Sequence, residues 1–260
     1  GNAAIPFHNL LLDADGRLWA GSVNNGLYRL DADRNRLVSR NPIRELSNQS
    51  IANLLTVDDE IWLTTDNDLV SFRDTSDVND PEVFCYVSDM DVNFSSSASL
   101  LIEDTLVFGA TEGVFNLALE DIRMQPHLNS QMIMTDFIVN GKSYRELDDS
   151  GEDINYVSEI NVKKGDNVEI RYTLADYNDY QTPLYRCTCN GVSWITAEDA
   201  LSFEVSSAKT VVQISHPASG QSKTIVIIAR SYWQYLIIVL MLVVIFLTYR
   251  IYSLKTRRSD

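Results

Sequence analysis

Cysteine is scarce in this 260-residue chain and occurs at Cys85, Cys187 and Cys189. No C-x-x-C pair is present, which excludes the usual zinc-ribbon and thioredoxin-like sites. Cys187 and Cys189 are two residues apart, so they share one face if they lie on a strand. We expect all three to be small buried apolar side chains. An extracytoplasmic compartment would permit a disulfide, but the odd count and the tight spacing argue against one.

Histidine is equally scarce, and His8, His127 and His216 are far apart and lie beside turns or prolines. None lies on a helix of the kind that carries a phosphoacceptor. The patterns G-x-x-x-x-G-K-[ST] and G-x-S-x-G are also lacking, which excludes P-loop and nucleophile-elbow chemistry. The pair Asp148-Asp149 lies in a Ser- and Gly-containing loop, whereas a glycosidase pair needs fixed surroundings. We predict no catalytic residue, no metal site and no cofactor, and hence no enzyme in this segment.

Positive charge is sparse: 21 Lys and Arg stand against 36 Asp and Glu, a net charge of −15. Four of the basic residues gather at the C-terminal end, at Arg250, Lys255, Arg257 and Arg258. Nucleic-acid binding requires clustered Lys and Arg. The acidic remainder therefore argues against a nucleic-acid partner.

Residues 235–247 form an unbroken apolar run. Its flanking aromatic residues are Tyr232, Trp233, Tyr249 and Tyr252. With these flanks a helix would reach about 31 Å at ~1.5 Å per residue, close to a hydrocarbon core of ~30 Å. A buried core helix is the alternative, but it would carry a polar stripe, and this run has none. We predict one transmembrane helix over residues 231–253 and a cytoplasmic basic stub over 254–260.

The basic residues that follow the helix set its orientation by the positive-inside rule. We therefore expect a single pass through the inner (cytoplasmic) membrane, with the N-terminal region periplasmic or otherwise extracytoplasmic. The chain starts Gly-Asn without Met and has no signal peptide. We expect a processed product or a fragment of a longer protein.

Three segments in the first 120 residues repeat one pattern. Each has a short apolar strand, a polar turn and a second alternating strand, which predicts a β-hairpin. Equivalent positions Trp19, Trp62 and Val107 are separated by 43 and 45 residues. A period of ~40–45 residues with several short strands is typical of propeller blades. Another apolar strand precedes each hairpin, at residues 10–12, 51–55 and 98–102.

The turns of these hairpins are Asn25-Gly26, Asn67-Asp68 and Glu112-Gly113, where a positive φ costs little. The earlier sequence Asp13-Ala-Asp15-Gly16 admits a calcium loop or a tight turn. The rest of an EF-hand loop is missing. We therefore predict a turn.

The repeats resemble the two-component regulator propeller repeat. The matching residues are Trp19, Gly21 and Gly26 in the first segment, Trp62 in the second, and Gly109 and Gly113 in the third. Thr64 stands where the pattern has glycine, and Val107 where it has tryptophan. The resemblance implies about three β-propeller blades over residues 1–128. Closed propellers have ~4–8 blades, so we expect an incomplete propeller, with more blades upstream in the parent protein. An uncovered sheet edge or face would then permit self-association.

From about Gln131 the sequence changes character. Asn140-Gly141 is a strong hairpin signal. Seven short strands are expected, near residues 133–139, 159–162, 167–174, 184–189, 201–205, 210–214 and 222–228. Turn-delimited strands at this spacing predict an immunoglobulin-like β-sandwich over residues 129–230.

Residues 170–194 resemble the triple-tyrosine (YYY) domain. The matching residues are Tyr177, Tyr185, Gly191 and Trp194. Cys187 and Cys189 replace the second tyrosine and the leucine of the pattern, and their shared strand face indicates an exchange of core residues. Tyr177, Tyr180, Tyr185 and Trp194 could instead form a sugar-stacking surface, although a role in the sandwich core or a domain interface is the stronger expectation.

The order of propeller blades, YYY domain and single helix is more specific than any part of it. It implies the extracytoplasmic segment of a two-component sensor, often a hybrid histidine kinase, whose kinase is absent from this chain. The resemblance also implies a homodimer through the YYY domain and an oligosaccharide or other small nutrient as ligand of the full propeller. Two alternatives remain: a membrane-anchored carbohydrate-binding or adhesion protein without signalling, and a propeller hydrolase or lyase, for which no site is visible.

Overall fold

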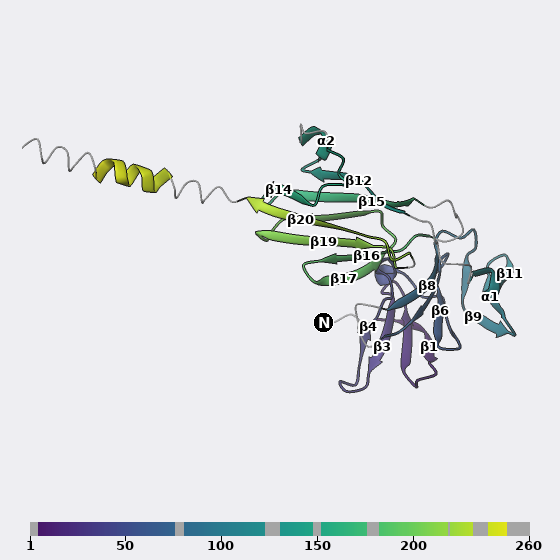
Figure 1. Ribbon diagram of the computed structural model, residues 1–260. Helices are drawn as coiled ribbons and strands as arrows, with labels where there is room; N and C mark the ends of the chain where they lie inside the picture. The colour runs from purple at the N-terminus through teal and green to yellow at the C-terminus, as the bar shows by residue number, and fades with distance from the viewer. Residues whose placement is uncertain are drawn as a thin grey trace, which may run out of the picture.

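The computed structural model describes residues 5–75, 81–122, 131–147, 152–175, 182–217, 219–230 and 239–248. These residues form five β-sheets, which confirms a mainly β protein. Figure 1 shows two β-rich units, one built from the strands up to residue 118 and the other from the strands after residue 131.

The first unit contains three small antiparallel sheets, which we call blades 1, 2 and 3. Blade 1 consists of β1 (Phe7–Leu12), β2 (Leu18–Ser22), β3 (Leu27–Asp31) and β4 (Arg36–Ser39) in that order. Blade 2 consists of β5 (Asn53–Val57), β6 (Glu60–Thr64), β7 (Leu69–Arg73) and β8 (Glu82–Val87) in that order. Blade 3 consists of β9 (Phe94–Ile102), β10 (Thr105–Ala110) and β11 (Gly113–Ala118), followed by the short helix α1 (Leu119–Ile122). A 3₁₀ helix, η1 (Arg44–Asn48), joins blades 1 and 2.

The three predicted hairpins are confirmed as the pairs β2–β3, β6–β7 and β10–β11. Gly26 and Gly113 adopt the expected positive φ, at 72° and 141°. The expectation is wrong at Asn67-Asp68, where neither residue has a positive φ. There the side chain of Thr65 holds the turn, because its Oγ1 accepts the Asp68 N–H at 3.0 Å.

Alternating residues of blade 2 pack against blade 1 on one side and blade 3 on the other. Trp19 of blade 1 and Phe72 of blade 2 meet edge to face, with ring centroids 5.6 Å apart. Trp62 points to the opposite side and packs with Leu106 and Phe108 of blade 3. Strand pleat explains this division, since neighbouring residues face opposite sides of a sheet. Within the described residues the three blades do not form a closed ring, and their first strands, β1, β5 and β9, contact one another.

The second unit has two sheets. The first has the order β13 (Lys142–Ser143), β12 (Gln131–Val139), β15 (Asn167–Ala175) and β18 (Ala200–Glu204), with helix α2 (Tyr144–Leu147) after β13. The second has the order β14 (Glu159–Lys163), β20 (Ser222–Arg230), β19 (Lys209–Ser215), β16 (Tyr185–Cys189) and β17 (Val192–Thr196). Both sheets contribute to one core, so the unit is a sandwich.

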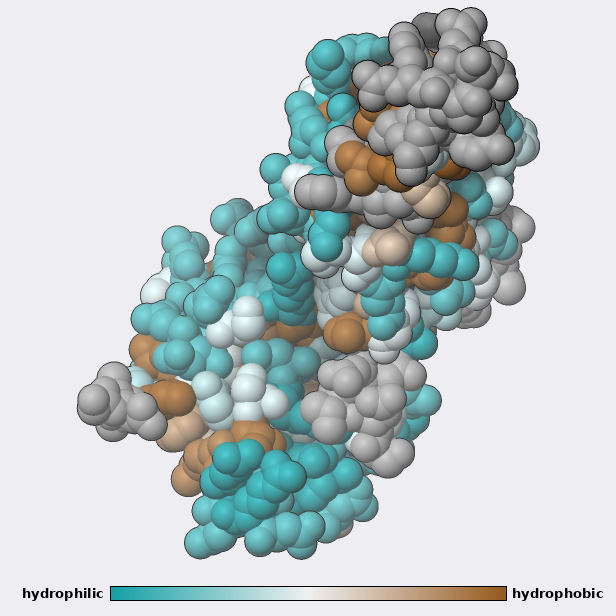
Figure 2. All heavy atoms as spheres, turned by 90° about the vertical axis from the view of Figure 1, so that its left-hand side faces the viewer, coloured by the Kyte–Doolittle hydropathy of each residue, from teal (hydrophilic) through white to brown (hydrophobic). Residues whose placement is uncertain are grey.

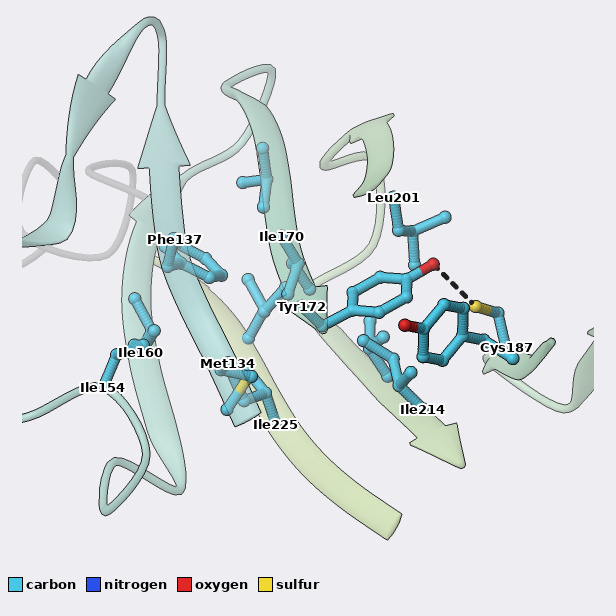
Figure 3. Close-up of a cluster of buried hydrophobic side chains, with 14 of the residues drawn as sticks. Met134, Phe137, Ile154, Ile160, Ile170, Tyr172, Cys187, Leu201, Ile214 and Ile225 are labelled. Carbon is cyan, nitrogen blue, oxygen red and sulfur yellow. Dashed lines mark hydrogen bonds between the residues drawn. The ribbon is translucent and has the colours of Figure 1, made fainter. Parts of the chain in front are cut away.

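Figure 3 shows this core, in which Phe137 and Ile170 come from the first sheet and Ile214 and Ile225 from the second. Cys187 also lies in the core with no exposed surface, and its Sγ is 3.3 Å from the hydroxyl of Tyr172. Cys189 is half-buried on the same face and packs against this cluster. The three cysteines are free thiols, and Cys85 and Cys187 are buried as predicted, whereas Cys189 is only half-buried.

The sandwich has two strands more than predicted. Asn140-Gly141 makes the expected tight turn, with φ of 51° and 82°, and the short strand β13 follows it. Asn190-Gly191 makes a turn of the same kind, with φ of 49° and 85°, and β17 follows it. The pair β14–β20 is parallel, and the remaining strand pairs of the described sandwich are antiparallel.

The described part of the predicted membrane segment is helical over residues 239–248. The apolar side chains from Val239 to Leu247 are all exposed, at 49–63%. No helix in the described ranges is both long and apolar enough to cross a membrane. The remainder of the predicted segment, residues 231–238 and 249–253, lies outside the described ranges, as does the predicted stub.

Candidate functional site at the joint between blades and sandwich

A joint connects blades 1 and 2 to the edge of the sandwich. On the blade side it is formed by η1, whose residue Leu46 is fully buried and anchors the helix in the core between blades 1 and 2. On the sandwich side it is formed by the end of β17. Ile195 of β17 is 3% exposed and packs with the blade core around Trp19, not with the sandwich core. The sandwich therefore places one apolar side chain into the other unit.

Glu45 of η1 clasps the backbone next to that side chain. Its Oε1 accepts hydrogen bonds from Thr196 Oγ1 at 2.5 Å and from Ala197 N at 2.7 Å. Hydrogen bonds to a charged acceptor are shorter and stronger than neutral ones. The Arg44–Glu198 pair beside them is 3.9 Å apart with both side chains more than half exposed, so it contributes little. Glu45 is thus the polar centre of the joint.

A second contact ties blade 2 to the segment just before β16 of the sandwich. Thr182 donates its N–H to the carbonyl oxygen of Tyr86 at 3.0 Å. Its Oγ1 lies 2.9 Å from the hydroxyl oxygen of Ser88. Two separate chain segments of the sandwich are therefore held by the blades, and rotation about either one is restricted.

Acidic groups near the joint shape its electrostatics. Burial raises the pKa of the Tyr86 hydroxyl, and the charges of Asp68 and Glu45 raise it further. Burial also raises the pKa of Asp68, although hydrogen bonds from the Asp89 N–H and the Thr65 hydroxyl partly offset that effect. Negative charge is therefore costly on this side of the joint.

The sequence motif Asp13-Ala-Asp15-Gly16 is a turn in the structure, as predicted. Asp13 Oδ1 accepts the N–H groups of Asp15 at 3.0 Å and of Arg17 at 2.8 Å. Its Oδ2 accepts the indole N–H of Trp19 at 2.9 Å and the Arg17 Nε at 2.8 Å. Burial alone would raise the pKa of Asp13, but the hydrogen bonds from Trp19 and Arg17 prevail and lower it. All the carboxylate's partners come from the protein.

Asp74, which follows β7, joins blade 2 to blade 1. It forms ion pairs with Arg40 at 2.7 Å, with Arg17 at 3.6 Å and with Arg29. Arg40 and Asp74 are both almost fully buried, at 4% and 1% exposed side-chain surface. Removing the carboxylate would leave buried positive charge without its partner, a change that is strongly destabilising.

Asparagines on the first strand of a blade bridge to the next blade, and this repeat was not recognised in the sequence. Asn9 Nδ2 donates to the carbonyl oxygens of Ile51 at 2.8 Å and Ala52 at 2.9 Å. Asn53 Nδ2 donates to the Ser95 carbonyl oxygen at 3.0 Å, and its Oδ1 accepts the Ala98 N–H at 2.7 Å.

The third equivalent position is Ser97, whose Oγ donates to Asn9 Oδ1 at 2.7 Å. Asn9, Asn53 and Ser97 are each 44 residues apart in the sequence. This regular spacing is the sequence feature that indicates a repeated polar position. It is less conspicuous than the tryptophans and glycines of the same repeat.

Two of the predicted motif glycines are explained by close packing. A Cβ on Gly21 would lie 2.8 Å from the Cβ of Ile51, which lies just before β5 of blade 2. A Cβ on Gly109 would lie 2.7 Å from the Cβ of Ala98 on the neighbouring strand. Gly26 has a positive φ, and a Cβ there would also collide with Asn41 Oδ1. The structure therefore gives these residues a packing role.

The aromatic motif residues have core positions where the structure describes them. Trp19 and Trp62 have no exposed surface, and Tyr185 is 1% exposed. Tyr185 therefore has no exposed ring face on which a sugar could stack. Its ring packs edge to face on Tyr172, with ring centroids 4.9 Å apart, and its hydroxyl oxygen accepts the Leu174 N–H at 3.1 Å. Trp194 is half-buried against the sandwich core.

The predicted Tyr177 and the proposed stacking residue Tyr180 lie outside the described residues, as does His127. The same holds for the predicted membrane-interface residues Tyr232, Trp233, Tyr249, Arg250, Tyr252, Lys255, Arg257 and Arg258. The structure thus leaves these expectations as predictions.

An open depression of about 410 Å³ lies on the outer side of the first sandwich sheet. Its lining includes Ile138, Glu169, Ser202 and Glu204. It is separate from the joint. Across the described ranges, no cluster of three His, Cys, Asp or Glu residues is arranged to hold a metal ion.

The structure therefore defines a β protein in which a stack of small blades is docked onto the edge of a two-sheet sandwich. No protein-family model matches the chain, and no curated protein sequence matches it. Its structure is similar to the extracellular domain of a hybrid two-component system of B. thetaiotaomicron, with 19% identity and a TM-score of 0.36, over 90% of this chain and 32% of that one.

A second hybrid two-component system of B. thetaiotaomicron gives 14% identity and a TM-score of 0.33, over 87% of this chain and 38% of that one. PorZ, a surface component of the type-IX secretion system of Porphyromonas gingivalis, gives 12% identity and a TM-score of 0.35, over 88% of this chain and 39% of that one. The chain thus spans about a third of the length of these structures. At these TM-scores the likeness carries no conclusion about the site or the ligand of this chain.

Proposed function

We propose that this chain is the ligand-sensing and signal-transmitting segment of a membrane-anchored two-component sensor. Its blades contribute to a propeller that binds a glycan or other small nutrient outside the cell. Its sandwich is an immunoglobulin-like YYY domain that pairs with a second copy. The apolar segment near the C-terminus anchors the chain in the inner membrane and leads to a cytoplasmic histidine kinase supplied by a longer parent chain.

One observation carries the proposal. β17, which forms the joint with the blades, and β20, which leads to the apolar segment, are strands of the same sheet. β17, which meets the blades, pairs with β16; β16 pairs with β19, and β19 with β20. β20 ends at Arg230, shortly before the apolar run at 235–247. A hydrogen-bonded sheet moves as a unit, so a rotation at Thr196 is carried to Arg230.

The exposed helix at residues 239–248 supports the anchoring part of the proposal. Its apolar side chains are 49–63% exposed, and water is a costly environment for them. Ten helical residues extend for ~15 Å at ~1.5 Å per residue. A bilayer core of ~30 Å would accommodate this helix together with the rest of the apolar run.

The mechanism is a shift between two states of the joint. A ligand changes this equilibrium only by its difference in affinity for the two states. In the state described here, the hydrogen bonds of Glu45 to Thr196 and Ala197 hold blades 1 and 2 against the sheet that contains β17. A ligand that favours another orientation of blades 1 and 2 would move β17, and with it β20.

The test uses the full chain in lipid nanodiscs and a panel of α-glucan, β-xylan, β-mannan and uronic-acid oligosaccharides. A ligand at ~100 Kd adds ~2.7 kcal/mol of stability, which raises the Tm by roughly 5–10 °C for a chain of this size. Spin labels on exposed Lys209 of two copies report the distance between the sandwiches. We expect at least one glycan to raise the Tm and to change that distance.

A glycan that raises the Tm and leaves the distance unchanged would support an anchored adhesion or carbohydrate-binding protein without signalling. Hydrolysis of a glycan in the same panel would support a hydrolase. A chain that binds none of the glycans and shows no pairing of its sandwiches would contradict the proposal.

A further inference from the structure

Basic side chains gather at one end of the sandwich, although the chain is strongly acidic. Residues 1–230 contain 17 Lys and Arg against 35 Asp and Glu. Five of these basic residues are exposed on neighbouring turns and strand ends, and we call them the basic end: Lys142, Lys163, Lys164, Lys209 and Arg230.

Strand pairing brings three of the five together in the second sheet. Lys163 is the last residue of β14 and pairs with Arg230, the last residue of β20. Lys209 begins β19 and pairs with Ile228, two residues before Arg230. The guanidinium of Arg230 is held in place, because its Nε donates to Asn161 Oδ1 at 2.9 Å.

Hydrogen bonds between turns add the other two residues, Lys142 and Lys164. Asp166 closes the turn that contains Lys164, because its Oδ2 accepts the Lys163 N–H at 2.7 Å. The other oxygen, Oδ1, accepts a side-chain N–H of Asn140 at 2.9 Å. Asn140 begins the turn that leads into Lys142. The basic end is therefore a fixed arrangement that draws on both sheets of the sandwich.

The basic end and the joint lie at opposite ends of the second sheet. Tyr185 pairs with Thr196 at the joint. Its neighbour Arg186 pairs with Ser215, the last residue of β19, whereas Lys209 is the first. In Figure 1, β20 points away from the blades. Figure 2 looks at the molecule from this side, and hydrophilic residues are prominent in its upper half, at the height of the sandwich in Figure 1.

Acidic groups of the described residues balance this charge only in part. Asp166 and Glu204, which pairs with Asn167, are the acidic residues of these turns and strand ends. Helix α2, which follows β13, contributes one residue of each sign, Arg145 and Glu146. The sandwich therefore carries a local surplus of positive charge in a chain whose net charge is −15.

The basic end is also close to the apolar segment. Arg230 precedes Tyr235, the first residue of the apolar run, by five positions, and five residues extend over at most ~18 Å. Attraction between basic groups and an anionic membrane acts within about one Debye length, ~10 Å at 0.1 M salt. The acidic residues of the blades, beyond the other end of the sandwich, are screened at this range. The local charge of the basic end therefore decides how the sandwich interacts with a membrane surface.

We infer that the basic end of the sandwich binds the anionic headgroups of phospholipids at the membrane surface on the sandwich's side. The inference rests on the membrane anchoring proposed above and adds an electrostatic contact to the apolar one. Lysine and arginine side chains donate several charge-assisted hydrogen bonds, and phosphate oxygens are suitable acceptors. Because Lys209 and Arg230 lie on paired strands of the sheet that leads to the apolar segment, this contact orients β20 relative to the membrane.

The test uses the full chain in nanodiscs of zwitterionic phosphatidylcholine and in nanodiscs that also contain anionic phosphatidylglycerol. Acylation of each lysine by a water-soluble ester is followed by mass spectrometry. We expect Lys142, Lys164 and Lys209 to react several-fold more slowly in the anionic discs, because headgroups cover their ammonium groups. High salt should remove this difference. Lys223 is the internal control, since it lies near the joint end of β20, and its rate should be the same in both discs.

A matched pair of variants separates the basic end from net charge. Lys164→Gln with Lys209→Gln removes two charges from the basic end and should reduce the protection of Lys142 about fivefold for each charge. Arg34→Gln with Arg36→Gln removes two charges from blade 1 and should leave that protection unchanged. All four substituted side chains are exposed, so both double variants keep the folded core.

Equal lysine rates in the two kinds of nanodisc, or the same loss of protection in both double variants, would overturn the inference. Soluble glycerol phosphate that protects the same lysines in zwitterionic discs would also overturn it and would assign them to a free anion. A chain that is retained in both discs with equal lysine rates overturns this inference alone. A chain that is retained in neither contradicts the proposed membrane anchoring, and the inference fails with it.

Discussion

Glu45 and Thr196 are 151 positions apart in the sequence, and their side chains are joined by a hydrogen bond of 2.5 Å. The same carboxylate oxygen accepts the neighbouring backbone N–H of Ala197. Ile195 lies next to this clasp in the blade core. A polar hydrogen-bonded contact beside a buried apolar side chain restrains the distance and the orientation of the two units, as the proposed transmission from the blades to the sandwich requires.

Replacing Glu45 with alanine should loosen the joint and leave each unit folded. Two hydrogen bonds are lost and the Ala197 N–H loses its partner, at a cost of ~1–3 kcal/mol. In a double-mutant cycle with Thr196→Val, we expect a coupling energy of ~0.5–3 kcal/mol from urea unfolding. Glu198→Ala is the control and should change stability by less than ~1 kcal/mol, because its ion pair is exposed. Additive effects at Glu45 and Thr196 would show that the clasp does not operate.

Gly109 should tolerate alanine only when its neighbour is made smaller. A Cβ at residue 109 would lie 2.7 Å from the Cβ of Ala98, and overpacking of this kind costs ~1–3 kcal/mol. We expect Gly109→Ala to lower the Tm, and Ala98→Gly in the same chain to restore part of the loss. Ala98→Gly alone is the control, with a cost of ~0.5–1 kcal/mol in a strand. A double variant less stable than Gly109→Ala would argue against steric overlap as the cause.

Asp13 should contribute stability that depends on pH. Hydrogen bonds from Trp19 and Arg17 outweigh burial and hold the pKa of Asp13 below its ordinary 3.8. An acid with a lowered pKa stabilises the folded chain above its unfolded pKa, and this contribution is lost as the pH falls through the folded pKa. The stability gap between the wild type and Asp13→Asn should therefore be largest near neutral pH and shrink below about pH 4.

Chemical denaturation at several pH values measures this gap. Asp15→Asn is the control for the loss of one carboxylate at this turn, since the Asp15 side chain is 69% exposed. A gap for Asp13→Asn that widens as the pH falls would contradict the assignment.

A charge in the exposed apolar helix should release the chain from membranes. Leu242→Lys places a cation near the middle of the apolar run, at a cost of ~2.5–3.5 kcal/mol or more in a bilayer. We expect carbonate washing to extract this variant and to leave the wild type and Leu242→Phe in the membrane pellet. Equal retention of all three would count against membrane anchoring by this segment.

Short-range patterns predicted much of the fold. Turn residues and alternating strands around Trp19 and Trp62 placed the hairpins of the blades. Asn140-Gly141 placed the first turn of the sandwich. β17 was missed because it is only five residues long and begins directly after Asn190-Gly191. The turn at Asn190-Gly191 joins β16 to β17, so this dipeptide is a hairpin signal of the same kind as Asn140-Gly141.

The joint could not be predicted, for a physical reason. Nothing in the local sequence around Glu45 distinguishes a clasping carboxylate from a solvated one in an acidic chain. Its partners at 196 and 197 become neighbours only when the two units dock. The asparagine bridges are an intermediate case: the 44-residue spacing of Asn9 and Asn53 is visible in the sequence, whereas their backbone partners are not.

Amide hydrogen exchange in β20 provides the most direct test of transmission through the joint. The protein is the full chain in nanodiscs, with and without a glycan identified from the panel, as wild type and as Glu45→Ala. We predict that the glycan changes the exchange rates of residues 222–230 in the wild type, and that Glu45→Ala still binds the glycan but loses this change. Unchanged rates in the glycan-bound wild type, or the same change in both proteins, would contradict transmission through Glu45.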